Sequence, residues 1–468
     1  MIFNSVQYVA FLAVVVGIYW RLPRRGQNLL VLVASYVFYG AWDARFLVLI
    51  AISTVVDFVV GTRLGREGTS GRSRRGWLVV SIAVNLGILG FFKYAGFFAT
   101  SFAALAAKVG VEVSPFVLDV VLPVGISFYT FQTLSYTIDV YRGRFPPTHD
   151  LLDFATYVAF FPQLVAGPIE RAANLLPQFA HQRRRPDAAT LRSGLGLIAL
   201  GLVMKVVVAD ALGPYVDDAY AAPREMGGLH MLLATYAFGL QIYADFAGYT
   251  AVARGSARLL GVELMRNFEQ PYLSTNITDF WRTWHISLST WLRDYLYIPL
   301  GGNRGTAWRT GRNLMITMLL GGLWHGASWN FVIWGGLHGA FLVVHRRLRR
   351  PERRRDLALR DLPSILVTFH AVTFAWIFFR APTFADARSV IGAIVTWRDR
   401  DLPLDLPWVL AAAVVLTLTI DLAQRRTGWQ LPFPTWPRVA RGLAYGTAAV
   451  LFVVFSGQPI QPFIYFQF

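Results

Sequence analysis

The chain has 468 residues, of which 55% are hydrophobic and only 15% are charged, whereas an average soluble domain has about 25% charged residues. With a mean hydropathy of +0.45, this composition excludes a soluble globular fold and predicts an all-α, polytopic integral membrane protein. No polar stretch is long enough to form a separate globular domain, so we expect a single membrane domain over residues 1–468.

The chain has no cysteine, which excludes disulfides, thiolate nucleophiles and cysteine-ligated metal sites. A formal net charge of +17 would suit a nucleic-acid partner. The basic residues, however, of which only three are lysines, form short clusters between apolar runs. This placement is typical of membrane-protein loops, and we therefore expect no nucleic-acid binding.

Apolar runs of the length that a helix needs to cross a bilayer, about 20 residues, recur along the chain. The first run has no basic residue before it and no small-residue cleavage site, so it is interpreted as a retained helix and not as a signal peptide. The predicted spans are approximately 5–20, 27–42, 46–62, 77–92, 118–141, 193–212, 230–252, 361–379, 407–424 and 439–456.

Clusters of basic residues separate these runs and predict the topology. Short loops rich in arginine and lysine mark the cytoplasmic face, and two apolar runs separate most successive clusters. We therefore expect the N-terminus on the extracytoplasmic side of the membrane. The loops predicted to be cytoplasmic are 21–25, 63–75, 142–144, 171–192, 254–312, 346–360 and 425–441.

Two apolar regions, 151–170 and 313–345, interrupt this alternation because basic residues flank both of their ends. Both are predicted to be re-entrant segments or hairpins. Irregular backbone at membrane depth requires surrounding protein or a water-filled cavity, so Gly167-Pro168 and the glycine pairs at 321–322 and 335–336 indicate an internal cavity. The alternative is ordinary close helix packing through small residues.

His325 is the strongest candidate for a catalytic group. It lies 13 residues after Arg312, so a helix would carry it about 20 Å inward at 1.5 Å per residue, near the middle of the bilayer. An ionisable residue there indicates function, and burial is expected to keep its imidazole neutral and able to accept a proton. The alternative is a structural histidine bonded to a neighbouring helix. The similar Gly335–Ala340 sequence places His338 in a packing or supporting role.

His285 belongs to the segment 279–295, where large apolar residues recur at helical spacing between Arg282 and Arg293. The pattern predicts an interfacial amphipathic helix. One interpretation is simple membrane anchoring, and the other is a cytoplasmic mouth through which an acyl donor enters, with His285 supporting the site.

The remaining polar candidates carry weaker signals. His149, His181 and His345 lie in loop-like sequence, whereas His230 and His370 lie in spans without a supporting motif. Four buried polar groups are expected within the spans, and of these Asp245 either orients a base or pairs with an arginine. These groups are Asp57, Asp139, Gln241 and Asp245.

Common catalytic motifs are missing from the sequence. It contains no Walker loop, no H-E-x-x-H and no G-x-S-x-G, so nucleotide hydrolysis, zinc proteolysis and α/β-hydrolase chemistry lack support, and no metal site is expected.

Five blocks of sequence resemble the membrane-bound O-acyltransferase family, and within it the branch of the bacterial alginate O-acetyltransferase membrane subunit. In order and spacing they match over nearly the whole chain. The blocks are Pro123–Gln132, Phe160–Arg171, Asp279–Asn303, Gly321–Gly339 and Pro462–Phe468.

This resemblance implies a ring of membrane helices around a funnel or tunnel with re-entrant segments. It implies transfer of an acyl group, most simply acetyl, from a cytoplasmic acyl-CoA or acyl-carrier thioester towards an extracytoplasmic hydroxyl. The family's essential histidine falls on His325 and its second histidine on His285, with His325 as general base. An acyl-enzyme on Ser287, Ser289 or Ser328 is the alternative.

Further residues and partners follow from the same resemblance. Arginines such as Arg282, Arg293 and Arg304 would suit a coenzyme A phosphate. The expected partners are a donor or carrier protein, membrane lipid, an extracytoplasmic acetyltransferase and a surface polysaccharide. The predicted substrate-binding residues are Trp324, Asn330, Trp284, Arg282, Arg293 and Asp245.

Three alternatives remain at this point. The acyl group could be D-alanine destined for a cell-wall polymer, as in a sister branch of the family. The chain could instead be a transporter, because it has broken apolar segments and polar groups at membrane depth. It could also be a non-catalytic scaffold of a glycan-modifying complex, in which case His325 would be dispensable.

Overall fold

A computed structural model describes residues 1–68, 70–114, 122–165, 167–348, 357–397, 402–428, 437–455 and 461–466. No residue in these ranges lies in a β-strand, in agreement with the predicted all-α membrane fold. Some predicted features lie partly outside the described residues. These are 118–121 and 456 of two predicted spans, Ala166, most of the basic loop 346–360, residues 429–436 of the last basic loop, and Gln467 and Phe468.

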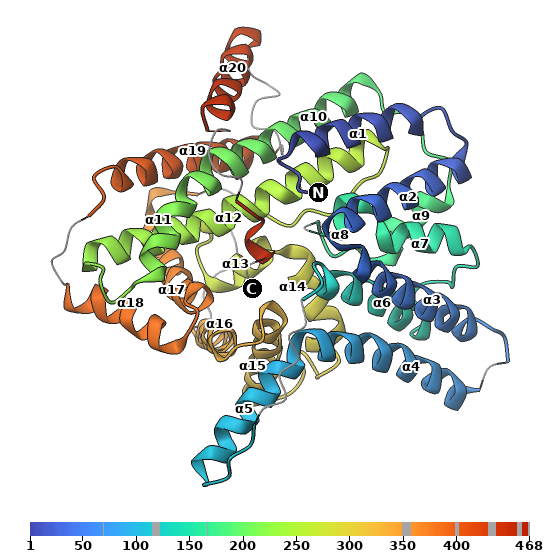
Figure 1. Cartoon of the computed structure of the whole chain (residues 1–468), viewed down its shortest axis with the longest axis horizontal. Helices are drawn as coiled ribbons and strands as arrows, with labels where there is room; N and C mark the ends of the chain where they lie inside the picture. Colours follow the sequence, from blue (N-terminus) through green and yellow to red (C-terminus); the bar gives the residue numbers. More distant parts are fainter. Residues whose placement is uncertain are drawn as a thin grey trace. The chain divides into compact units, whose positions relative to one another are not determined.

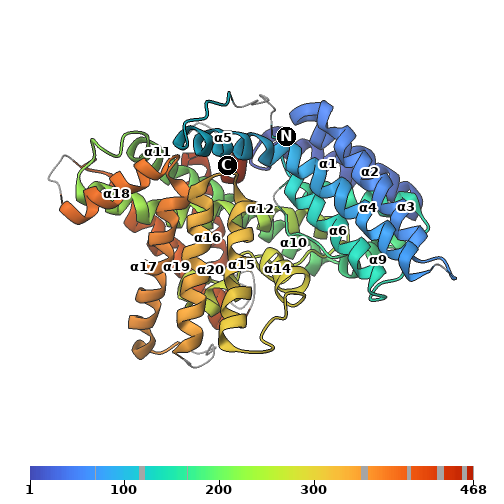
Figure 2. The same ribbon diagram turned by 90° about the horizontal axis from the view of Figure 1, so that it is seen from below.

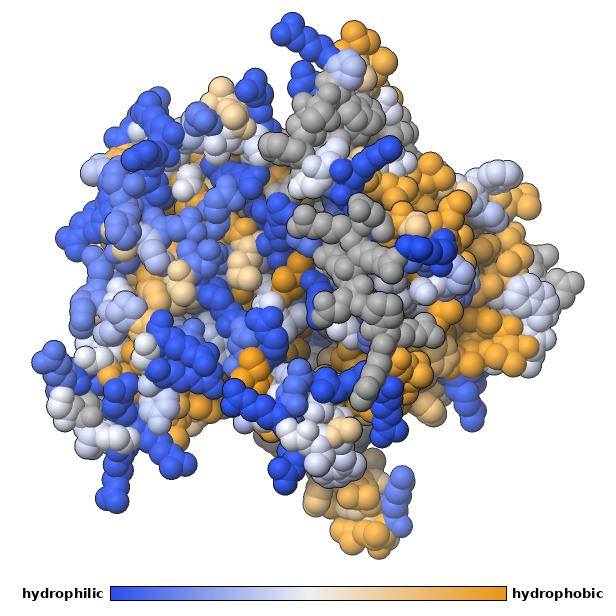
Figure 3. All heavy atoms as spheres, turned by 180° about the vertical axis from the view of Figure 1, so that it is seen from behind, coloured by the Kyte–Doolittle hydropathy of each residue, from blue (hydrophilic) through white to orange (hydrophobic). Residues whose placement is uncertain are grey.

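Five apolar helical runs in the described part of the chain are long enough to cross a membrane. They are Arg24–Leu64, Gly71–Lys108, Ala188–Ala221, Leu359–Arg380 and Leu406–Thr427. Many apolar side chains on these helices are exposed, including Val33, Phe102, Leu195 and Val415. Hydrophobic and hydrophilic side chains are both visible on the face drawn in Figure 3, as expected where lipid replaces water around part of a protein.

The chain divides into two compact units, the first comprising residues 3–191 and 256–265. Most of its helices are coloured blue to teal in Figure 1. Its helices are α1 (Val6–Tyr19), α2 (Arg24–Asp43), α3 (Leu47–Leu64), α4 (Gly71–Leu89), α5 (Ala95–Lys108), α6 (Ile126–Tyr141), α7 (Leu151–Ala159), α8 (Phe161–Leu164) and α9 (Ala172–Ala180).

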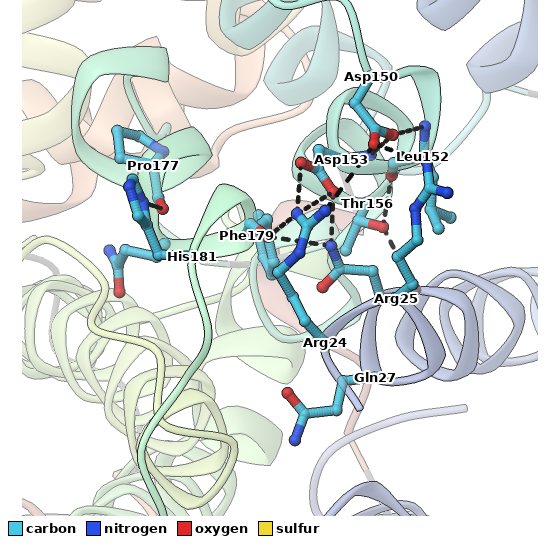
Figure 4. A network of polar contacts seen from close by, with 12 residues as sticks. Arg24, Arg25, Gln27, Asp150, Leu152, Asp153, Thr156, Pro177, Phe179 and His181 are labelled. Carbon is cyan, nitrogen blue, oxygen red and sulfur yellow. Dashed lines mark hydrogen bonds and ion pairs between the residues drawn. The ribbon is translucent and has the colours of Figure 1, made fainter. Parts of the chain in front are cut away.

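Buried polar side chains link helices inside this unit. Asp57 of α3 accepts hydrogen bonds from Ser81 (2.6 Å) and Asn85 (2.8 Å) of α4. At a different place, shown in Figure 4, Arg24 of α2 lies 2.8 Å from Asp153 of α7 and donates to a backbone carbonyl of α9. Such bonds hold helices together where water cannot compete for them.

The region 151–170 consists of two short helices, α7 and α8, which are nine and four residues long. Neither reaches the length of about 20 residues that a membrane crossing requires. Nearly all of their side chains are buried in protein, which is the environment that an interrupted segment needs at membrane depth.

The second unit comprises residues 192–255 and 266–468. Its helices are α10 (Ala188–Leu202), α11 (Asp210–Ala221), α12 (Gly228–Leu259), α13 (Ile277–Thr283), α14 (Ile286–Leu292), α15 (Ala307–His325), α16 (Trp329–Arg347), α17 (Leu362–Arg380), α18 (Phe384–Thr396), α19 (Leu406–Thr427) and α20 (Arg438–Phe455). A π-helical segment, η3 (Val203–Ala209), joins α10 to α11, and a final turn, η7 (Ile464–Phe466), follows α20.

The region 313–345 forms the hairpin of α15 and α16, which lie side by side (Figure 2). Glycines make their close approach possible. A Cβ atom on Gly322 would collide with the carbonyl of Phe331, and one on Gly335 would collide with the carbonyl of Met318. One glycine of each predicted pair, Gly322 and Gly335, therefore serves helix packing within this hairpin.

Candidate active site

His285 lies at a break between two short helices. It stands in the left-handed backbone region (φ +42°) and precedes α14. Asn267 holds this turn, because its carbonyl oxygen accepts the N–H of Ile286 (2.9 Å) and its Oδ1 accepts the hydroxyl of Ser287 (2.6 Å). The His285 side chain is fully buried. Its unusual backbone therefore positions an imidazole inside the protein.

The prediction of one continuous amphipathic helix over 279–295 is thus wrong. The segment forms α13, α14 and a π-helical turn, η5 (Arg293–Tyr297). Trp284, Leu288 and Trp291 of the predicted apolar stripe are buried in the protein. The extended Trp284 and the left-handed His285 interrupt the predicted helix, and the stripe packs inward instead of forming a lipid-facing surface.

His325 is the last residue of α15 and is 5% exposed. As predicted, one uninterrupted helix connects it to Arg312. Gly326 follows it at the turn into α16, where a Cβ atom would collide with the ring of Phe331. The small residues around His325 thus allow the hairpin to turn tightly at the imidazole.

The two histidines face one another. Their ring centroids are 6.4 Å apart, with an angle of 61° between the ring planes. Aromatic rings enclose the pair. Around His285 these are Phe246 (4.7 Å) and Trp324 (5.8 Å), and around His325 they are Trp324 (5.0 Å), Trp334 (5.0 Å) and Phe379 (5.2 Å).

Tyr465, from η7 near the C-terminus, completes this enclosure. Its ring centroid lies 5.6 Å from that of His325 and 6.4 Å from that of His285. Its hydroxyl is buried and has no hydrogen-bond partner among the described residues. Sequence analysis assigned no role to this residue, although it lies in the last of the five matching blocks. The only available signal was a polar hydroxyl within an aromatic run.

Of the other predicted site residues, only Trp324 borders both histidines. Trp284 packs on Phe280 (5.4 Å) and on Trp376 (5.1 Å), and Trp376 in turn packs on Trp334 of the enclosure (5.7 Å). Asn330 donates to the carbonyl of Ala381 (2.8 Å) and so joins the start of α16 to the end of α17. Both residues lie outside the set of aromatic side chains that encloses the histidines.

The structure does not place the predicted Arg282 and Arg293 beside the histidine pair. The side chains of Arg282 and Arg293 are 53% and 58% exposed, and each lies beside a neighbouring aspartate. Asp245 is buried, and its ion-pair partner is Lys205 (2.9 Å), not an arginine. The expectation that Asp245 binds an arginine is therefore corrected.

The remaining histidines lie apart from this pair. His338 is buried and accepts a hydrogen bond from the indole of Trp281 (3.3 Å). His345 bonds to Thr278 and His370 bonds to Tyr236, whereas His149 and His181 are exposed. No group of three or more potential metal-ligating histidine or acidic side chains occurs in the parts of the chain that the structure describes.

A cavity of about 560 Å³ lies in the second unit and shares a wall with the His285 turn. Asn267, which holds that turn, lines the cavity, and so does Phe268, whose ring packs 5.1 Å from Phe246. The cavity is rich in arginine, which suits a phosphate-bearing ligand. These arginines are Arg254, Arg266, Arg425 and Arg426.

Two buried imidazoles in an aromatic enclosure are suited to moving a proton in a site from which water is excluded. A neutral imidazole can accept a proton from a hydroxyl, and low polarity strengthens every electrostatic interaction within the site. Two of the three serines considered as nucleophiles are already engaged, since Ser287 donates to Asn267 and Ser289 donates to the carbonyl of Trp284.

Residues 144–381 match the sequence model of the membrane-bound O-acyltransferase family. The chain is 45% identical over 401 residues to the probable alginate O-acetylase AlgI of Azotobacter vinelandii, covering 85% of this chain and 79% of that protein. It is 39% identical to the protein of the same name from Pseudomonas putida, over the full length of both chains. The peptidoglycan O-acetyltransferase of Helicobacter pylori is 34% identical over 84% of this chain and 80% of its own.

Proposed function

Because the chain belongs to the membrane-bound O-acyltransferase family, we propose that it transfers an acetyl group from a cytoplasmic thioester donor for O-acetylation of an extracytoplasmic polysaccharide. The chain is an acyltransferase and a multi-pass membrane protein. The names of the relatives, alginate O-acetylase and peptidoglycan O-acetyltransferase, support the choice of an acetyl group and a glycan. The acceptor at this site is the glycan itself or a partner acetyltransferase that passes the group on.

The proposed mechanism uses His325 as the general base. As the acceptor oxygen attacks the thioester carbonyl carbon, His325 takes the proton of the acceptor hydroxyl. The carbon–sulfur bond then breaks, and the departing thiolate takes the proton back from the imidazolium, so that charge and protons balance. General-base catalysis of this kind supplies a factor of about 10²–10⁴, and positioning in the enclosed site supplies much of the rest.

We assign the arginine-rich cavity to the phosphate-bearing part of the donor. The cavity and the His285 turn share Asn267, and a thioester arm anchored there would approach the imidazoles along the same wall. His285 is then the residue that orients the donor carbonyl. Coenzyme A and an acyl-carrier protein share this phosphate chemistry.

The same proposal includes the location of the protein and its orientation in the membrane. The entire chain acts as one acyltransferase domain in the bacterial plasma membrane, with its N-terminus outside and the arginine-rich loops in the cytoplasm. A donor or carrier protein meets it from the cytoplasm, while membrane lipid surrounds the spans.

The single observation that carries the proposal is the enclosed pair of imidazoles 6.4 Å apart. The test is the O-acetyl content of surface glycan in cells that carry wild-type or His325→Ala protein at equal membrane abundance, with the glycan quantified separately. We expect loss of acetyl ester with unchanged glycan export, because the base is lost. His149→Ala, at an exposed loop position, is the matched control.

Each other outcome contradicts the proposal in its own way. Retained acetylation would remove His325 from the chemistry and favour a scaffold. Lost export would indicate a transporter, and D-alanyl esters in place of acetyl esters would indicate the other donor class.

A further inference from the structure

A lysine and two aspartates form a buried ion-pair cluster in the second unit, and the proposed mechanism does not use it. Lys205 Nζ lies 2.8 Å from Asp210 Oδ1 and 2.9 Å from Asp245 Oδ1, and the three side chains are between 3% and 6% exposed. Ionisable groups buried in a membrane protein are costly and usually serve a function. The contacts of this cluster indicate what that function is.

Close helix packing brings the three charges together. Gly201 of α10 lies against Gly248 of α12 so closely that a Cβ atom on either residue would collide with the other's carbonyl. Lys205 follows in η3, where the helix widens into a π-helical turn. Single π-helical turns are frequent at functional sites, and this one presents the ammonium group to Asp245 on α12.

The cluster holds a segment from the far end of the chain. The backbone N–H of Ile464 donates to Asp245 Oδ2 (2.7 Å), and Lys205 donates to the carbonyl of Pro462 (3.4 Å). Both members of the Lys205–Asp245 pair therefore bind the backbone of residues 462–464, here called the C-terminal strap. In Figure 1, η7 lies beside α12.

The residue that directly follows the strap contacts both histidines. Phe463 packs on Tyr249 of α12 (4.5 Å), and Ile464 is 2% exposed. The next residue is Tyr465, whose ring lies 4.7 Å from Phe246 and 5.6 Å from His325. The residue directly after the anchored Ile464 therefore forms part of the wall of the enclosure.

We propose that Lys205 and Asp245 are positioning residues for acyl transfer: they hold the C-terminal strap so that Tyr465 closes the site against His325 and His285. This inference rests on the proposed function, because it assigns the ion pair a role in that same site. The pair acts through the strap, and neither charge touches the substrate.

Asp210 provides a control within the same cluster. It pairs with Lys205, but its carboxylate makes no hydrogen bond to the strap within the described residues. Asp210→Leu and Asp245→Leu each remove one carboxylate and each leave Lys205 with one partner. The two variants therefore change the buried charge equally, and only Asp245→Leu frees the strap.

The first readout is the position of the strap itself. Because the chain has no cysteine, Ile464→Cys provides a single reactive thiol that preserves the N–H bound by Asp245. We expect N-ethylmaleimide to label this thiol at least about tenfold faster in the Asp245→Leu background, because the local opening free energy falls. The rate in the Asp210→Leu background should stay close to that of the parent. A cysteine at the buried Ala393 of α18 should remain protected in both and reports global folding.

The second readout is catalysis with the cysteine-free chain. We expect Asp245→Leu to lower turnover by about 10²-fold, the loss that follows a displacement of about 1 Å in a site, with an unchanged KM for an acetyl thioester donor. Asp210→Leu should keep its turnover. Asp245→Asn, whose amide oxygen can still accept the Ile464 N–H, should recover most of the activity.

A variant outside the ion pair keeps the test decisive if Asp245→Leu fails to fold. Ile464→Pro removes the donated N–H and leaves all three charges in place. We expect turnover to fall as it does for Asp245→Leu, whereas Gln461→Pro at the start of the same segment should have little effect.

Three results would overturn the inference. They are equal labelling in the two leucine backgrounds, a released strap with normal turnover, and normal turnover in Ile464→Pro. Labelling does not depend on catalysis, so a failure of the proposed acyl transfer would leave the strap result interpretable by itself.

Discussion

At the scale of single residues, the site depends on two imidazoles that an aromatic enclosure keeps from water. His285 reaches it from a left-handed turn held by Asn267, and His325 reaches it from the end of a long helix. The helical periodicity of 279–295 gave no sign of that turn. Both residues were nevertheless predicted as partners, because the matching sequence blocks carry them.

His285→Ala should separate the roles of the two histidines. We expect the KM for the donor to rise and turnover to fall by about tenfold, because in the proposed mechanism the residue orients the donor and does not carry the proton. Steady-state kinetics of acetyl transfer with the purified protein would measure both values. A loss confined to turnover and as large as that of His325→Ala would instead indicate that the imidazoles act as one unit.

Tyr465→Phe removes one buried hydroxyl and preserves the ring. We expect turnover to fall by about tenfold, because the hydroxyl, which has no partner among the described residues, would donate one hydrogen bond to the reacting acyl group, with unchanged expression and donor KM. Tyr236→Phe, whose hydroxyl bonds to His370 away from the site, is the matched control. Full activity of Tyr465→Phe would restrict Tyr465 to a packing role.

At the scale of elements, glycine positions determine how closely helices approach. The hairpin of α15 and α16 places His325 at its tip, so the packing of the hairpin also determines where the proposed base lies. From the sequence alone, the paired glycines indicated either an internal cavity or close packing between helices. The collisions that a Cβ atom would cause at Gly322 and Gly335 favour packing within the hairpin.

Gly335→Ala and Gly336→Ala form a matched pair that tests this. A methyl group at Gly335 would collide with the carbonyl of Met318, whereas at Gly336 it would meet only Leu319 Cδ2 at 3.6 Å. We expect Gly335→Ala to destabilise the protein by about 1–3 kcal/mol and Gly336→Ala to leave it unchanged or more stable. Thermal unfolding in detergent would show the difference, and equal midpoints would contradict the packing argument.

At the scale of the whole molecule, an excess of arginines over acidic residues gives the chain its net charge of +17. Four of these arginines line the cavity beside the His285 turn. They come from segments far apart in the sequence, and for that reason sequence analysis selected Arg282 and Arg293 instead, which are exposed.

Arg426→Gln should weaken donor binding without slowing the chemistry. We expect the donor KM to rise by about tenfold, the value of one charge-assisted hydrogen bond, with little change in kcat and a weaker dependence on salt. Arg360→Gln, which is exposed on another basic loop, should change neither. An unchanged KM for Arg426→Gln would move the donor away from this cavity.

The sequence by itself determined the membrane class and the family, and it singled out His285 and His325 as the candidate pair. Hydropathy and ordered motifs are local properties, which can be read along a chain. Only the tertiary structure decided that α13 and α14 break at His285, that Lys205 is the partner of Asp245, and that Tyr465 meets a histidine from another helix. Each of these depends on contacts between residues tens to hundreds of positions apart, where packing and charge pairing, and not local preference, determine the result.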